Sequence, residues 1–211
     1  MYRYLDTVLA DLKKKIRREF NYLGSMGFDE LNVVNTRKIT QEIFDRLLAE
    51  NNDAYLKVAK KAYRAAKVIE SVDEKVVEGV DDKFVETTLS AYNLVTGYLY
   101  FKEVERKRLR LSEQILTARE YDDRTAFNAS LRKTANLWYT QTSQYGVDIV
   151  DAATLKAYKD SGVEYVMWMS QDDGKECADC ENRHKKIYRI TDVPAKTHYG
   201  CRCYLKPAEK E

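Results

Sequence analysis

The cysteines of this 211-residue chain are confined to its C-terminal segment, where they form two close pairs. Cys177 and Cys180 are separated by two residues, Cys201 and Cys203 are separated by one, and His198 precedes the second pair. Thiolate and imidazole donors at this spacing can surround one tetrahedral Zn²⁺, which binds sulfur and nitrogen without redox chemistry. The pattern therefore predicts a structural zinc site formed by four of these five residues.

Five donors compete for four positions around such an ion, so one of them does not bind it. Cys177 and Cys180 supply one pair of ligands, and Cys201 with either Cys203 or His198 completes the set. His198 could instead support the site through a hydrogen bond to a thiolate or a carboxylate. The spacing alone agrees with both arrangements.

Two disulfides are the competing interpretation of four clustered cysteines, because an even number of cysteines suits a secreted domain. The first residues, from Met1 to Asp6, do not form an apolar leader segment, and no stretch is apolar for long enough to cross a bilayer. A chain of this length also has little need of covalent cross-links. We therefore expect reduced cysteines, a metal site rather than disulfides, and no membrane among the partners.

Basic residues beside the cysteines point to a second kind of contact, with phosphate. Lys185, Lys186 and Arg189 form the basic cluster nearest to the predicted metal site and are the candidate nucleic-acid ligands. The whole chain carries 36 Lys and Arg against 34 Asp and Glu, so it lacks the strong positive field of a dedicated DNA packager. Any contact with DNA is therefore expected to be local.

A metal-dependent nuclease of the HNH type is the alternative from a catalytic class, because such enzymes also combine cysteines with histidines. It requires a histidine that activates water and further groups that hold a divalent ion beside the phosphate. His184 with Asp172 and Asp173 would have to fill these roles, yet Asp172-Asp173-Gly174 is typical of a turn and His184 of a solvated loop. We therefore expect no enzymatic activity and no small-molecule substrate.

The residues ahead of these motifs have a helical pattern. Both prolines, Pro194 and Pro207, fall in the cysteine-bearing segment, and apolar residues elsewhere recur three or four positions apart. Long amphipathic helices of this kind pack as an antiparallel hairpin or against a partner. Helices are predicted over about 2–22, from an Asn35 N-cap to beyond Ile69, from Phe84 to about Arg119, over about 123–144, and from an Asp151 N-cap to Ser161.

The pattern changes to short β-branched and aromatic runs after Gly162. Three strands are predicted, over 163–169, 186–190 and 201–205, and the last would place two cysteines on one face. The expected fold is mainly α with a small C-terminal α+β module: a long helical hairpin followed by a short-stranded sheet braced by a Cys/His metal site. The corresponding domains are a helical arm over 1–120 and the module over 121–211.

Between about residues 115 and 207 the chain contains an ordered set of motifs: Thr117-Ala118-Arg119-Glu120, Thr125-Ala126-Phe127-Asn128, Gly162-Val163, Trp168, Asp172, Cys177-x2-Cys180, Pro194-x3-His198-x2-Cys201-Arg202-Cys203 and Pro207. This set resembles the C-terminal signature of phage minor head proteins, the head-morphogenesis family that includes the Mu F-like proteins. This chain departs from the family over Glu181–Lys186, where a glycine-containing turn is usual, and has one proline before His198 where a pair is common.

The resemblance implies a protein that is built in few copies into the procapsid at the portal vertex. Its partners would be the portal protein and other capsid proteins, with DNA as a further contact. It would reside in the head of the virion, and in the host cytoplasm during assembly. The implied role is non-enzymatic, in head assembly or in DNA passage, and the nuclease and a zinc-braced DNA-binding module are the alternatives.

Overall fold

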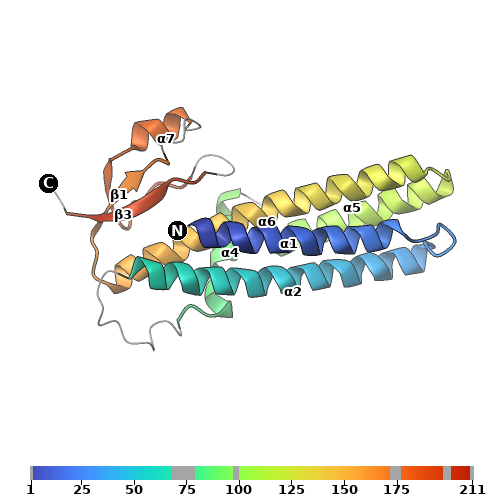
Figure 1. Cartoon of the computed structure of the whole chain (residues 1–211), viewed down its shortest axis with the longest axis horizontal. Helices are drawn as coiled ribbons and strands as arrows, with labels where there is room; N and C mark the ends of the chain where they lie inside the picture. The colour runs from blue at the N-terminus through green and yellow to red at the C-terminus, as the bar shows by residue number, and fades with distance from the viewer. Residues whose placement is uncertain (1, 68–78, 97–99, 172–176, 197–200, 210–211) are drawn as a thin grey trace.

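The fold is a bundle of long helices with a small antiparallel sheet at one end (Figure 1). The computed structural model describes residues 2–67, 79–96, 100–171, 177–196 and 201–209. The elements are α1 (Tyr2–Gly24), α2 (Val33–Ala66), α4 (Asp82–Thr96), α5 (Tyr100–Glu120), α6 (Arg124–Asp160), β1 (Tyr165–Met169), α7 (Ala178–Arg183), β2 (Ile187–Arg189) and β3 (Tyr204–Ala208). The predicted mainly α fold with a small C-terminal α+β module is confirmed.

Helix α6 is the central element of the bundle. It packs against α1, α2 and α5, and Figure 1 shows these long helices side by side along the long axis. Each helix buries one apolar stripe, and the joined stripes form a single core that includes Phe44, Tyr55, Tyr63 and Phe127.

Among the described residues, no helix combines the length and the apolar composition needed to cross a membrane.

Side-chain caps fix where several helices begin. The Asn32 side chain accepts a hydrogen bond from the Asn35 backbone N–H, so α2 begins at Val33 and the predicted Asn35 N-cap is wrong. Asn35 lies inside the helix, and its side chain donates a hydrogen bond to the Glu30 carbonyl oxygen.

The helix predicted from Phe84 to Arg119 is covered by α4 and α5, and residues 97–99 between them lie outside the described residues.

The predicted break between residues 144 and 151 does not occur, because α6 continues to Asp160. Gly146, a potential break, instead lies inside the helix and close to Leu5 of α1, since a Cβ there would lie 2.7 Å from Leu5 Cδ1. Asp151 is therefore not an N-cap, and its carboxylate binds groups outside its own helix. The predicted end is confirmed: Ser161 is the C-cap, and Gly162 follows with a φ of 73°.

The predicted domain boundary falls at the turn between α5 and α6. Asp123 caps α6 by accepting a hydrogen bond from the Ala126 backbone N–H. Because α6 packs along α1 and α2, the first part of the 121–211 segment belongs to the same core as the helices before it. The division into two domains stays a prediction.

The sheet has the strand order β2-β1-β3, and both pairs are antiparallel. In the β1–β3 pair Met169 lies opposite Tyr204, and Tyr165 lies opposite Ala208. The third strand therefore begins after the cysteines. It covers Tyr204–Ala208, so the predicted bounds of 201–205 are wrong. Pro207 is tolerated within β3 because this strand is an edge of the sheet.

Candidate metal centre

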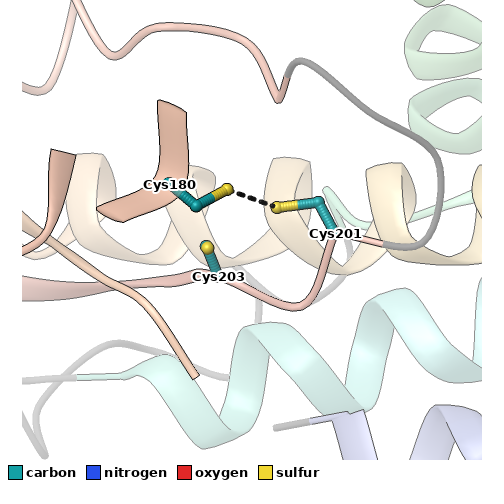
Figure 2. Close-up of side chains that lie close together, drawn as sticks. All are labelled: Cys180, Cys201 and Cys203. Carbon is teal, nitrogen blue, oxygen red and sulfur yellow. Dashed lines mark hydrogen bonds between the residues drawn. The ribbon is translucent and has the colours of Figure 1, made fainter. Parts of the chain in front are cut away.

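Three cysteine sulfurs gather in the interior of the C-terminal module. The Sγ atoms of Cys180, Cys201 and Cys203 all lie within 4.8 Å of one another, and Figure 2 shows them pointing toward one another. Their residues are only 2%, 1% and 4% exposed. Cys180 of the first sequence pair thus meets both cysteines of the second pair, and these three are a possible metal-binding group.

Separate elements bring these sulfurs together. Cys180 lies on the short helix α7, whereas Cys201 and Cys203 lie in the loop that leads into β3. Trp168 on β1 is 2% exposed and belongs to the same buried cluster as the three cysteines. The Arg183 guanidinium lies 5.2 Å from the centre of the Trp168 ring, which holds α7 over the sheet.

The sulfur distances fit a shared ion better than a disulfide. The Sγ atoms of Cys180 and Cys201 are 3.6 Å apart, whereas a disulfide bond is about 2.05 Å long. Four sulfurs placed tetrahedrally about 2.3 Å from one Zn²⁺ would lie about 3.8 Å from each other. All four cysteines are free thiols, and the three buried ones have nearly the mutual spacing of ligands to one ion.

Without a cation, the environment of the cluster keeps the buried thiols protonated. Burial, together with the hydrogen bonds that its thiol donates to the neighbouring sulfurs, raises the pKa of Cys180, and burial is also the main cause that raises the pKa of Cys203. A cation would offset this cost of ionisation. A hydrogen bond from the Trp168 side chain to Cys203 acts in the opposite direction and lowers the pKa of that thiol, because an N–H donor stabilises a thiolate.

The remaining two candidate ligands are Cys177 and His198. Cys177 is the N-cap residue of α7, is half-buried, and packs against the sulfur cluster. A hydrogen bond between its thiol and that of Cys180 is among the causes that raise the pKa of Cys180. His198 lies outside the described residues. The structure therefore supplies three buried ligands and one neighbouring thiol for the fourth position.

A partly buried cluster of polar side chains, which we call the anchor network, joins the cysteine loop to the bundle. It consists of Tyr2, Asp151, Lys196 and the backbone carbonyl of Cys203. The Tyr2 hydroxyl accepts from Lys196 Nζ (2.6 Å), and its proton faces Asp151 Oδ1 (2.7 Å) and the Cys203 oxygen (3.0 Å). Lys196 also forms an ion pair with Asp151 at 2.6 Å. Sequence reasoning missed this network, because its members are far apart in the chain and carry no motif.

The basic candidates lie on the outside of the module. Lys185, Lys186 and Arg189 are all exposed, on the turn before β2 and on β2 itself. Lys185 has a φ of 63°, and its backbone N–H donates to the Trp168 carbonyl oxygen, so the turn is fixed to β1. His184 was predicted to be solvated, but it is half-buried and its Nδ1 accepts a hydrogen bond from the Ser170 backbone N–H (3.1 Å).

Comparison of the chain with protein-family models, with curated proteins and with solved structures finds no match in any of the three. The sulfur cluster, its anchorage to the bundle and the basic turn are thus the features that bear on function.

Proposed function

We propose that this protein is a non-enzymatic minor head component of a tailed phage or prophage, in which one structural Zn²⁺ stabilises the C-terminal module. The observation that carries the proposal is the cluster of Cys180, Cys201 and Cys203, which is buried together with Trp168. Structural zinc sites are closed in this way, whereas catalytic ones keep an open position for water or substrate. The ion would hold the cysteine loop and α7 on the sheet.

The shape of the molecule and the ordered signature support the assignment to the phage head. The long bundle carries the small sheet at one end, so the two can contact different partners (Figure 1). The resemblance to minor head proteins covers the same C-terminal residues that form the sulfur cluster. In this proposal the partners are the portal protein and other capsid proteins, and the protein is located in the head of the virion.

Metal analysis of the purified protein tests the first part of the proposal. One zinc per chain is expected, with loss of the metal in Cys180→Ser and in Cys201→Ser, because each removes a buried ligand. Lys185→Ala is the matched control, since it changes an exposed residue of the same module. A metal-free wild-type protein, purified under reducing conditions without chelator, would refute the zinc site.

Co-expression with the portal protein of the same phage or prophage tests the second part. The two proteins are expected to elute together in size-exclusion chromatography, and a duplex DNA substrate is expected to stay intact with Mg²⁺ or Mn²⁺. Nicking of the DNA by the zinc-loaded protein, without portal binding, would replace the head role by the nuclease alternative.

A zinc-braced DNA-binding module is the second candidate, and the exposed turn with Lys185, Lys186 and Arg189 favours it. Replacing all three by Ala should weaken binding to duplex DNA and reduce the salt dependence of that binding, while the zinc content stays unchanged. Binding that is unaffected by the substitutions would exclude this surface.

A further inference from the structure

A long groove lies between the C-terminal part of α1 and the N-terminal part of α6. Figure 1 shows that these parts of the two helices lie in the half of the bundle remote from the sheet. Its volume is about 820 Å³, and it follows α1 from Arg17 to Ser25 and α6 from Thr125 to Asn136. These stretches span roughly 12–17 Å at 1.5 Å per residue, which equals two to three turns of a helix. The groove is therefore large enough to receive a short helical segment.

The floor of the groove is apolar. Phe20 and Leu131 lie along it and are each only 4% exposed, so a narrow strip of their side chains faces the groove. Gly24 lets α1 approach α6 closely, because a Cβ at this position would already lie 3.3 Å from Leu131 Cδ1. The groove between the two helices is thus shallow, and its apolar floor suits aliphatic side chains of a partner.

The rim of the groove is positively charged and rich in amides. Arg17 on α1 and Arg132 on α6 are both exposed, and neither forms an ion pair with a carboxylate of the described residues. No Asp or Glu is among the described residues that line the groove, whereas Asn21 and Asn128 offer hydrogen-bonding groups. A partner with acidic side chains beside its apolar ones would complement this rim.

We propose that this groove docks an amphipathic, acidic α-helix of a partner protein. Aliphatic residues of that helix, spaced three and four apart, would rest on Phe20 and Leu131, and its carboxylates would pair with Arg17 and Arg132. Nucleic acid fits less well, because the floor offers no exposed aromatic face for stacking and two cations neutralise few phosphates. The inference is independent of the zinc site.

Fluorescence anisotropy with two designed probes tests this proposal on the full chain. The first probe is a labelled helical peptide of about 15 residues with Leu at a three- and four-residue spacing and Glu beside each Leu. The second is identical except that Lys replaces every Glu. The Glu peptide should bind, and the double variant Arg17→Glu/Arg132→Glu should weaken its binding at least about tenfold.

Arg3→Glu is the matched control, because it reverses an exposed arginine of the same helix about 20 Å from Arg17. This control should bind the Glu peptide as the wild type does, and circular dichroism should show an unchanged helix content in both variants. Three results would overturn the proposal: no binding of the Glu peptide, equal binding of both peptides, or equal binding by the wild type and the double variant. Binding of a 20-base-pair duplex through Arg17 and Arg132, without any binding of the Glu peptide, would likewise refute it.

Discussion

The four cysteine residues differ in their exposure to solvent, and this difference predicts their individual roles. Cys180, Cys201 and Cys203 are buried, whereas Cys177 is half-buried at the N-cap of α7. A fourth ligand from this position would complete the coordination from the solvent side.

We therefore predict that Cys177, rather than His198, is the fourth ligand. Cys177→Ser should reduce the zinc content and lower the melting temperature, whereas His198→Ala should leave both nearly unchanged. Zinc analysis and thermal unfolding of the two variants, purified in parallel, check this prediction. The reverse pattern, with metal lost only from His198→Ala, would assign the fourth position to the imidazole.

Asp148 on α6 is a half-buried carboxylate that opposes folding at neutral pH. Burial raises its pKa to about 7, the nearby Asp151 charge adds to this effect, and a hydrogen bond from Gln144 opposes it. Its Oδ2 atom is buried and makes no hydrogen bond within the described part of the chain. Because the folded pKa is above the unfolded one, the carboxyl group favours folding most at low pH, and this contribution is lost as the pH rises through about 7.

Asp148→Asn should therefore stabilise the protein more at pH 8 than at pH 5. We expect the difference between variant and wild type in the free energy of unfolding to grow by about 1 to 2 kcal/mol over this range. Urea unfolding at both pH values measures it, with the exposed Glu113→Gln as the control. A pH-independent difference would mean that Asp148 titrates normally.

At the scale of the elements, the contact between α1 and α6 depends on Gly146. Replacing this glycine by Ala adds helix propensity of about 1 kcal/mol, but the new Cβ would meet Leu5 Cδ1 at 2.7 Å in a part of the core where Leu5 is 1% exposed. Overpacking a core costs about 1–3 kcal/mol, so the clash should outweigh the gain.

Gly146→Ala is thus expected to lower the free energy of unfolding by about 1 kcal/mol. Chemical denaturation of this variant, of Leu5→Ala and of the double variant forms a double-mutant cycle. The double variant should lose less stability than the sum of the two single changes, because the smaller side chain makes room for the new methyl group. Strict additivity would show that the two residues do not compete for space.

The sequence allowed the helices to be predicted because an apolar stripe is a local signal. The helix predicted over 2–22 is observed as Tyr2–Gly24. The long helix predicted from Asn35 is observed as Val33–Ala66, and its predicted part at Ile69 lies outside the described residues. The error at Asp151 has a different origin, since an aspartate caps a helix only if the residues before it are not helical. Whether they are helical depends on the packing of Gly146 against Leu5, and that contact cannot be read from nearby residues.

In the candidate site, too, the features with a local sequence signal could be predicted and those that depend on distant residues could not. The spacing of the cysteines was enough to predict that cysteines of both pairs meet, because zinc ligands recur at short intervals. The position of Cys201 and Cys203 before β3 depends instead on the register with β1, which two partner strands decide together. The contact between Lys196 and Tyr2 joins residues 194 positions apart, and such a contact carries no local pattern.

At the scale of the whole molecule, the two tryptophans report on separate clusters of buried residues. Trp138 packs edge-on against Phe44 in the bundle, with ring centres 4.9 Å apart, whereas Trp168 belongs to the sulfur cluster. The bundle core contains no cysteine among its described buried residues. Loss of the metal should therefore affect the module first and leave the bundle folded.

A zinc chelator at neutral pH should shift the emission of Trp168 to longer wavelength while that of Trp138 stays constant. The single-tryptophan variants Trp138→Phe and Trp168→Phe separate the two signals, and circular dichroism should show that most of the helix content persists. Simultaneous changes at both tryptophans would instead mean that the bundle and the module unfold as one cooperative unit.

The anchor network also has a consequence for how the protein is made. The Tyr2 hydroxyl meets the carbonyl oxygen of Cys203 across 201 positions of the chain. A ribosome that adds about 5–20 residues per second needs on the order of 10–40 s to cover this interval. In the first part of that time, until α6 (Arg124–Asp160) has been made, α1 lacks its main packing partner, so its apolar stripe is open to chaperones in the nascent chain.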